Sequence, residues 1–206
     1  MPHSPAINPR KAPKQQRSRA TVDAILEATA QVLVEHGYEK SSTNLIARRA
    51  GVSIGSLYQY FPNKEALVAA LAEKHVADVM SELVAKLEAA RGLPLRPALR
   101  VMIDGLLAHH AEKPRVHQVL IEEIPRIAGL ERMLEIDRLA VDMIAVALGT
   151  REEALRPQNI ELAVFMLVHA VQGITHAAVL ERPELLTGAD LTDEITDLVA
   201  RYLLAD

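Results

Sequence analysis

Apolar residues recur at helical spacing along most of this chain. Between Val22 and Leu33 they fall three and four positions apart, which predicts an amphipathic helix that ends at Gly37. Asn63 is placed to cap a second long helix that continues toward Gly92. Because no strand pattern competes, the predicted fold class is all-α. Glycine and proline positions divide the remaining chain into helical segments near residues 95–112, 115–124, 127–148, 158–181 and 190–204.

Residues 43–64, with the sequence TNLIARRAGVSIGSLYQYFPNK, predict two short helices joined by a tight turn. Ser42 or Thr43 is placed to cap the first helix at its amino end. Gly51 can adopt the left-handed conformation that turns the chain sharply, and Ser53 then opens the second helix. This is helix-turn-helix geometry, which in DNA-binding proteins places the second helix in the major groove.

The second helix would present its amino end to base edges, with Leu57 and Phe61 facing inward. Gln59 has the donor and acceptor that suit adenine, Ile54 can touch a thymine methyl group, and Gly55 would let the backbone approach DNA closely. Hydroxyl and cationic donors on either side would contact phosphates, although tyrosines also serve as packing groups and lysines are commonly solvated. The base-edge candidates are Ser53, Ile54, Gly55, Ser56 and Gln59, and the phosphate candidates are Thr43, Arg48, Tyr58, Tyr60 and Lys64.

The sequence GSLYQYFPNKEAL resembles very closely the signature of the tetracycline-repressor (TetR) family of transcriptional regulators. The resemblance covers roughly residues 17–76 and begins in the segment RSRATVDAILEATAQVLVEHGYEKSST. It implies an all-helical dimer whose ligand-binding core controls the DNA-binding heads. Many members carry an aromatic residue or histidine at the position of Gln59, so it is open whether Gln59 contacts a base or a phosphate. The family's DNA contacts carry over to Thr43, Ser53, Ile54, Gly55, Tyr58, Gln59, Tyr60 and Lys64.

Three parts are predicted along the chain. Residues 1–16 form a disordered basic arm, because this segment is rich in proline, lysine and arginine. Two roles are open for the arm: entry into the minor groove, or a solvated tail that adds affinity without sequence preference. Residues 17–64 form an N-terminal three-helix helix-turn-helix DNA-binding domain. Residues 65–206 form a C-terminal helical bundle for effector binding and dimerisation.

Charge and composition support a regulator that binds double-stranded DNA. The formal net charge is −4, but nine Lys and Arg against four Asp and Glu through Lys64 give that part +5 and leave −9 for the rest. The absence of cysteine excludes disulfides, thiol sensing and cysteine-rich zinc sites. Neither a signal-peptide pattern nor an apolar run of membrane-spanning length is found, so we expect a cytoplasmic protein with no membrane partner.

An enzyme is not expected, and neither is a cofactor or a metal. Residues 51–55 fit the G-x-S-x-G pattern of a hydrolase nucleophile elbow, but an elbow requires a strand before its serine, and residues 45–50 have a helical pattern with two arginines. A metal site would draw on His109, His110, Glu112 and His117. Adjacent histidines on a helix point about 100° apart, which disfavours a shared ion.

The segments 158–181 and 190–204 are rich in Leu, Val, Ala and Ile and resemble the helix pair that forms the dimer interface in the family. A two-fold homodimer would read the half-sites of a palindromic operator, roughly 34–36 Å apart. We therefore predict a TetR-like regulator, by family default a repressor, that a small-molecule effector releases from DNA. The rival hypotheses are an architectural or effector-independent DNA-binding protein and an enzyme that uses the helical core.

The effector itself is not identified by any fixed motif, because regulator pockets are mostly apolar cavities with a few polar groups. Large apolar residues and histidines at helical spacing are the candidates. For His169, together with His176, hydrogen bonding across a dimer interface is the alternative role. The candidate ligand-binding residues are Met102, Leu106, His110, Met133, Phe165 and His169.

Overall fold

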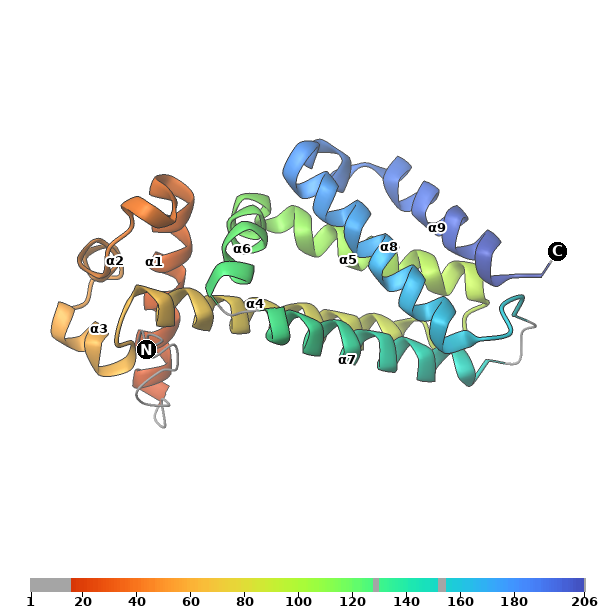
Figure 1. Cartoon of the computed structure of the whole chain (residues 1–206), viewed down its shortest axis with the longest axis horizontal. Coiled ribbons are helices and arrows are strands. Elements are labelled where there is room, and N and C mark those ends of the chain that lie inside the picture. The colour runs from red at the N-terminus through yellow and green to blue at the C-terminus, as the bar shows by residue number, and fades with distance from the viewer. Residues whose placement is uncertain (1–15, 128–129, 152–154, 206) are drawn as a thin grey trace. The chain divides into compact units, whose positions relative to one another are not determined.

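The computed structural model describes residues 16–127, 130–151 and 155–205, which form α-helices and one short 3-10 helix (Figure 1). Unit 1 comprises the chain up to Val76 together with Val119–Leu130, and unit 2 comprises Ala77–Gln118 and Glu131–Asp206. Of the predicted arm, only Gln16 lies within the described residues. The elements are α1 (Gln16–Lys40), α2 (Thr43–Arg49), α3 (Ile54–Tyr60), α4 (Lys64–Ala89), α5 (Leu95–Glu112), α6 (Pro114–Ile127), α7 (Leu130–Gly149), α8 (Ile160–Glu181), η1 (Pro183–Thr187) and α9 (Ala189–Leu203).

The all-α fold class predicted from the sequence is confirmed, and the predicted segments after Gly92 agree with the observed helices to within three residues. The largest differences lie around Pro125. There α6 continues to Ile127 instead of ending at residue 124. A proline lacks the backbone N–H donor and therefore disfavours a helix. In the last turn of α6 this effect does not end the helix. The 3-10 helix η1, which begins at Pro183, was not predicted.

Unit 1 is built around the apolar face of α1. Ile25, Val32 and Leu33 are buried, as the helical spacing predicted, and α1 packs against α2. The predicted end at Gly37 is a kink, because this residue has φ 71° and ψ 169° and the helical turns resume briefly after it. The Ser41 hydroxyl donates to the carbonyl oxygen of Gly37 at 2.6 Å. This bond fixes the chain where it turns from α1 toward α2.

Helix α4 contributes residues to both units, residues 64–76 to unit 1 and residues 77–89 to unit 2. Its amino end is capped as predicted, since the backbone N–H of Ala66 donates to Asn63 Oδ1 at 2.8 Å. Glu65 lies in the first turn, where a carboxylate favours the helix dipole. One continuous helix therefore carries the backbone from the first unit into the second.

In unit 2, α5 packs along α9. Leu107 of α5 and Leu203 of α9 are both almost fully buried. Two arginines of α5 pair with carboxylates of α9: Arg96 Nη2 lies 2.5 Å from Asp197 Oδ1, and Arg100 pairs with Asp193. The hydrogen bond from Arg96 is the main reason why the pKa of Asp197 lies below its usual range. These pairs fix the register of the two helices.

Helix α8 has one buried side and one exposed apolar side. Ala163, Val164 and Ala178 are buried, whereas Phe165 and Met166 are half exposed, at 50% and 49%. Among the described residues, α8 is the helix whose length and composition would allow it to cross a membrane, and one such helix is weak evidence for a membrane span. Less than a third of its apolar stretch is buried within the chain.

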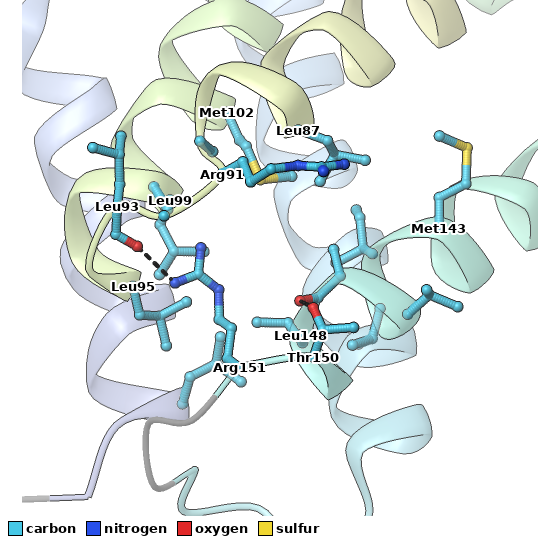
Figure 2. Close-up of a pocket in the computed structure, with 18 of the residues that line it drawn as sticks. Leu87, Arg91, Leu93, Leu95, Leu99, Met102, Met143, Leu148, Thr150 and Arg151 are labelled. Atoms are coloured by element: carbon cyan, nitrogen blue, oxygen red, sulfur yellow. Dashed lines mark hydrogen bonds between the residues drawn. The ribbon is translucent and has the colours of Figure 1, made fainter.

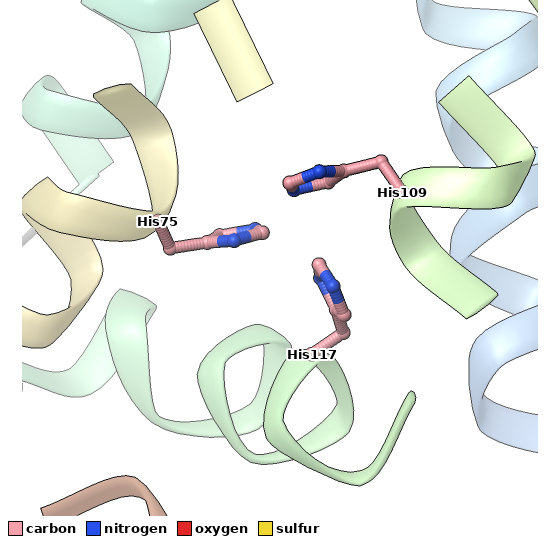
Figure 3. Close-up of side chains that lie close together, drawn as sticks. All are labelled: His75, His109 and His117. Atoms are coloured by element: carbon pink, nitrogen blue, oxygen red, sulfur yellow. The ribbon is translucent and has the colours of Figure 1, made fainter. Parts of the chain in front are cut away.

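Four histidines gather inside unit 2. The rings of His110 (α5) and His117 (α6) stack with their centroids 4.6 Å apart. The ring of His109 meets that of His117 edge to face, with centroids 5.4 Å apart (Figure 3). The ring of His176 (α8) lies 6.3 Å from that of His110. Imidazole rings therefore connect α5, α6 and α8 inside unit 2, where aliphatic side chains would more commonly fill the core.

Burial keeps two of these imidazoles, those of His110 and His176, neutral. Removal from water lowers the pKa of His110 to about 4, more than the hydrogen bond between its Nδ1 and the carbonyl oxygen of Leu106, 2.8 Å away, can raise it. Burial likewise lowers the pKa of His176, against the opposing effect of the Asp137 carboxylate. These two imidazoles therefore carry no positive charge near neutral pH.

We expect the free energy of unfolding to fall between pH 7.5 and pH 5. The unfolded chain protonates His110 near the ordinary pKa of 6.5, whereas the folded chain does so only near 4. The native state is therefore favoured above pH 6.5, and this contribution is lost as the pH falls toward 4, by about 2 kcal/mol over the interval tested. Urea unfolding at both pH values should show that His110→Leu loses this part of the pH dependence.

The exposed His36 on α1 provides the matched control. His36→Gln removes an exposed imidazole that lies outside the cluster, so it should keep the part of the pH dependence that comes from His110. An unchanged pH dependence in His110→Leu would contradict the assignment to the buried imidazole.

Candidate nucleic-acid interface and cavities

The segment from α2 to α3 has the caps and turn that the sequence predicted. Ser42 caps α2, with its hydroxyl oxygen accepting from the N–H of Leu45 at 3.3 Å. Gly51 has φ 68°, the left-handed conformation that the tight turn requires. Ser53 caps α3 by accepting from the N–H of Ser56 at 3.0 Å. Since α2 precedes the turn, the serine of the G-x-S-x-G pattern follows a helix, and the elbow interpretation fails as predicted.

The inward face of α3 fixes which side chains point outward. Leu57 and Phe61 are 0% and 1% exposed, as predicted. On a helix, the residues between two such inward positions project to the other side. Tyr58 is accordingly 40% exposed, and Ile54, the first residue of α3, is 37% exposed. The remaining candidates on this face are also accessible: Ser53, Gly55 and Gln59 are exposed, and Ser56 and Tyr60 are half-buried.

Gly55 is not required by the fold of its own helix. A Cβ atom at this position would meet only the Ser53 hydroxyl oxygen, at 3.9 Å, which is ordinary van der Waals contact. Its backbone is helical, and an alanine would favour the helix by roughly 0.5–1 kcal/mol. The protein itself therefore offers no reason for a glycine here.

Two of the predicted phosphate contacts lie together at the edge of this face. The hydroxyl groups of Thr43, at the start of α2, and Tyr58, on α3, are 3.1 Å apart. Arg48, further along α2, is exposed. The three side chains supply hydroxyl and guanidinium donors beside the exposed end of α3, which suits contacts to phosphate oxygens.

Lys64 is not a solvated lysine, which was the alternative to a phosphate contact at this position. Its ammonium donates to the carbonyl oxygen of Tyr38 at 2.7 Å and lies 3.8 Å from the centroid of the Tyr38 ring. Burial, followed by the hydrogen bond to Glu65, raises the pKa of Tyr38 to about 12. Lys64 thus joins the start of α4 to the end of α1 in the absence of DNA.

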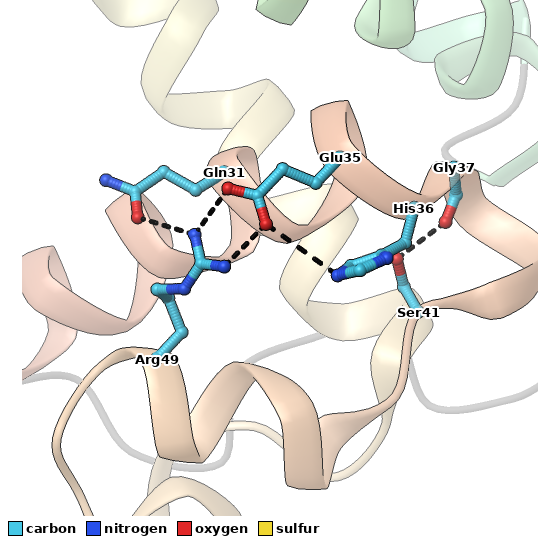
Figure 4. Close-up of polar contacts among 6 residues, drawn as sticks. All are labelled: Gln31, Glu35, His36, Gly37, Ser41 and Arg49. Carbon is cyan, nitrogen blue, oxygen red and sulfur yellow. Dashed lines mark hydrogen bonds and ion pairs between the residues drawn. The ribbon is translucent and has the colours of Figure 1, made fainter.

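A polar contact that the sequence did not reveal holds α2 on α1. The Arg49 guanidinium binds both carboxylate oxygens of Glu35, at 2.7 and 2.5 Å, and donates to Gln31 Oε1 at 3.3 Å (Figure 4). His36 lies 3.7 Å from the same carboxylate. The hydrogen bond from Arg49 is the main cause that lowers the pKa of Glu35. This fork-like pairing restricts the rotation of α2 about its own axis.

Two of the cavities among the described residues of unit 2 are neighbours. The larger, of about 880 Å³, lies among α4, α5, α7 and α8 and is lined mainly by aliphatic side chains (Figure 2). The smaller, of about 170 Å³, is bounded by the same four helices. Of the predicted ligand-binding residues, Met102 lines both cavities and Leu106 lines the smaller one. The volume of the larger cavity falls in the range of small-molecule sites.

The other predicted ligand-binding residues lie elsewhere. His110 is buried in the histidine cluster and lines neither cavity. Phe165 and His169 contact each other on the exposed side of α8, with ring centroids 4.4 Å apart, and also line neither cavity. The side chain of Met133 lies outside the described residues. Helical spacing groups residues by face, but it does not tell a cavity wall from a packed core or an outer surface.

Several cavity residues were missed for the same reason. Leu99, Ile144 and Leu167 line both cavities, yet in the sequence they are ordinary members of apolar helical patterns. Arg91 and Arg151 line the larger cavity and follow the ends of α4 and α7. The sequence feature that marks these two arginines is a positive charge at the end of an apolar helix. Such charges are also common at helix ends where no ligand binds.

Comparison with known proteins agrees with this geometry. The chain is similar over 186 residues, at 27% identity, to a helix-turn-helix-type transcriptional regulator of Mycobacterium tuberculosis H37Rv, covering 87% of this chain and 92% of the other. It is similar to SmeT, the repressor of the Stenotrophomonas maltophilia multidrug efflux pump SmeDEF, with a TM-score of 0.69 and 27% identity over 91% of this chain and 93% of SmeT. A SmeT–triclosan complex matches equally well, with a TM-score of 0.69 and 26% identity over the same shares.

Both parts of the chain match models of one protein family. Residues 25–71 match "Bacterial regulatory proteins, tetR family", and residues 94–203 match "Tetracyclin repressor-like, C-terminal domain". The first match contains α2, the turn and α3, and the second contains most of the residues that line the two cavities. The resemblance seen in the sequence is therefore confirmed, and this chain belongs to the TetR family of helix-turn-helix transcriptional regulators.

Proposed function

We propose that this regulator is a cytoplasmic repressor that binds a palindromic operator as a homodimer and leaves it when a small molecule occupies the cavities of unit 2. The observation that carries the proposal is the exposed face of α3. Ile54 and Tyr58 are exposed to water there, and the fold itself does not require the residue at position 55 to lack a side chain. These features cost the isolated protein stability, and contact with DNA explains them together.

The roles of the interface residues follow from their positions. Ser53, Ile54, Gly55, Ser56 and Gln59 would face base edges, and Thr43, Arg48, Tyr58 and Tyr60 would contact phosphates. Lys64 would reach a phosphate only while giving up or sharing its hydrogen bond to the Tyr38 carbonyl. We therefore propose that the main role of Lys64 is to attach α4 to α1, and that contact with DNA is its secondary role.

A second copy of the chain is the proposed cover for the exposed side of α8. Leu162, Phe165 and Met166 are about half exposed, and Leu198 of α9 is 52% exposed. Apolar side chains that gather on one surface favour association, and a symmetric pair of chains can bury the same patch twice. Two heads are also needed, because one short helix contacts too few base pairs to select a single site.

Effector control follows from the helix that both units share. Residues 79–87 of α4 line the cavities, and residues 64–76 belong to the unit that carries α3. A ligand that prefers one position of α4 would shift the equilibrium between DNA-binding and released dimers. SmeT, a repressor with a known triclosan complex, supports this proposal for a related chain.

Gly55→Ala should separate folding from DNA binding. The added methyl group stabilises α3 but lies where DNA must approach, so we expect an unchanged or higher melting temperature with roughly tenfold or more weaker operator binding. Fluorescence anisotropy with a selected duplex and thermal melting would measure both. Gly149→Ala is the control, because its Cβ also enters open space but at the end of α7. Equal DNA affinity in Gly55→Ala would contradict close approach at this position.

Selection from a pool of random duplexes should distinguish residues that contact base edges from residues that contact phosphates. Gln59→Ala should broaden the base preference at one position in each half-site, because an amide can pair with one base edge. Arg48→Ala should weaken all sequences alike and reduce the salt dependence by about one counterion. The reverse pattern would overturn the two roles. Retention without enrichment of any palindrome would favour the architectural alternative.

Phe165→Glu should convert the dimer to a monomer in sedimentation analysis and abolish tight operator binding. The carboxylate would lie unpaired in an apolar contact, which is costly to bury. Val84→Glu is the matched control, since Val84 is 48% exposed on α4, against 50% for Phe165 on α8. A Phe165→Glu protein that remains dimeric at micromolar concentration would exclude this face of α8 as the interface.

A further inference from the structure

The smaller cavity of unit 2 has a mainly apolar lining. Its walls come from α4, α5, α7 and α8, and the aliphatic side chains of its described lining include Leu83, Leu106, Ala140 and Val171. Its volume is about 170 Å³. An apolar protein cavity of about 150 Å³ is large enough to hold benzene. The space therefore suits one six-membered ring better than a larger ring system or a long chain.

The charged side chains of this lining form an ion pair that reaches the surface. Among the described residues that line the cavity they are Glu82 and Lys86, whose head groups lie 3.2 Å apart with 40% and 33% of the side chains exposed. The stem of Lys86 packs against Gly105 of α5, where a Cβ atom would come within 3.0 Å of three stem carbons. The stem thus adds hydrocarbon to the wall while the ammonium meets water. Since the two charges compensate each other, an ionic guest would be costly to bury here.

The uncharged polar groups lie at the end of the smaller cavity that is remote from the larger one. Met102 of α5 and Leu167 of α8 line both cavities, whereas His109 of α5 and Gln172 of α8 line only the smaller one. His109 follows Met102 by seven residues, which is about 10 Å along a helix. His109 and Gln172 therefore form the inner end of the smaller cavity.

Gln172 offers a hydrogen-bond acceptor at this inner end. Its amide nitrogen donates to Asp137 Oδ1 at 2.8 Å. Because a carboxylate only accepts, this bond fixes which side of the amide carries the nitrogen, and it uses none of the lone pairs of the amide oxygen. The Asp137 carboxylate disfavours an anion nearby, and burial lowers the pKa of His176, so this imidazole supplies no positive charge near neutral pH. A neutral O–H group is therefore the matching partner for the amide oxygen.

The lining favours an aromatic guest over a saturated one. The thioethers of Met80 and Met102 line the cavity, and methionine sulfur makes favourable contacts with aromatic rings. The imidazole of His109 adds an aromatic surface, which meets the ring of His117 edge to face (Figure 3). A rigid ring also loses less conformational freedom on binding than a flexible chain does.

We infer that the smaller cavity binds a neutral monocyclic phenol, with its hydroxyl donating to the amide oxygen of Gln172 and its ring against Met102 and His109. A phenol matches the three properties of the site, which are room for one ring, no uncompensated charge and one hydrogen-bond acceptor. The role of this ligand as effector rests on the proposed function, whereas the binding itself does not.

Calorimetric titration of the intact chain with 4-methylphenol and three analogues tests the ligand class. 4-Methylphenol should bind in the micromolar to submillimolar range. Toluene, which lacks the hydroxyl, should bind roughly fivefold more weakly. 4-Methylcyclohexanol lacks the aromatic ring and should bind several times more weakly, and 4-methylbenzoate, which must bury a charge, should not bind at millimolar concentration. Equal binding of toluene and 4-methylphenol, or tighter binding of the benzoate, would overturn the inference.

The protonation state of the ligand gives an independent check. 4-Nitrophenol loses its proton near neutral pH, so its affinity should fall about tenfold for each pH unit above that point. 4-Methylphenol is the control, because its hydroxyl keeps its proton up to about pH 10, as that of tyrosine does. Its affinity should stay constant between about pH 7 and pH 9. Tighter binding of the nitrophenolate anion than of neutral 4-nitrophenol would contradict a neutral ligand.

Two variants locate the hydroxyl and the ring. Gln172→Met removes the acceptor, so 4-methylphenol should fall to the affinity of toluene, while toluene keeps its own. Leu106→Trp should fill much of the cavity and weaken both ligands roughly tenfold or more. The matched controls are Gln158→Met and Leu180→Trp, at exposed positions outside both cavities, and they should leave both affinities unchanged.

Thermal melting checks that each variant folds, and the analogue series in the parent protein does not depend on the variants. A Gln172→Met protein that keeps the full difference between 4-methylphenol and toluene would contradict the position of the hydroxyl. Unchanged affinity for both ligands in a folded Leu106→Trp protein would exclude the smaller cavity as the site.

A parallel measurement separates this inference from the proposed function. The retention of a selected operator duplex is followed as 4-methylphenol is added. Binding of 4-methylphenol with the expected variant effects supports the site even if the protein never selects an operator, a result that would overturn the proposed function alone. Selection of a palindrome by a protein that binds none of the phenols would leave the DNA-binding proposal standing and overturn the inference.

Discussion

The burial of Leu57 and Phe61 is the constraint on which the DNA-facing surface depends. These two side chains commit one side of a seven-residue helix to the core of unit 1. Helical geometry then leaves Tyr58 and Gln59 on the other side, whatever their own preference. Ile54, at the amino end of the helix, is exposed as well. Exposing apolar side chains to water is unfavourable by itself, so the fold holds a surface that solvation alone would not favour.

Polar contacts around α3 add orientation to this apolar attachment. The fork between Arg49 and Glu35 fixes α2 on α1, and the ammonium of Lys64 fixes the start of α4 on Tyr38. Exposed pairs contribute little to stability in general. Their value here is geometric, because a helix that must enter a groove of DNA has to keep its direction within a narrow range.

The sequence predicted the parts of this structure that depend on local rules. The caps at Ser53 and Asn63, the left-handed turn at Gly51 and the inward position of Leu57 each follow from residues a few positions apart. The partner of Arg49 is Glu35, fourteen residues away on another helix, and no local pattern indicates it.

The cavities were the least predictable part for a related reason. A leucine that lines a cavity, such as Leu99, and one that fills a core, such as Leu107, have the same spacing in the sequence. The difference arises from how well the facing helices fill the space between them, which depends on the volumes of many distant side chains. Phe165 was assigned to a pocket on size alone, whereas its helix turns it outward.

The energies of ligand binding and DNA release can be compared directly. A ligand that binds with micromolar affinity gains about 8 kcal/mol, whereas a tenfold loss of DNA affinity requires about 1.4 kcal/mol. Only a small part of the binding energy must therefore depend on the position of α4. Leu83, Lys86 and Leu87 of α4 line the cavities, so a ligand there cannot bind without contacting this helix. Coupling of the required size needs only a modest preference for one position of α4, and no separate signalling element is necessary.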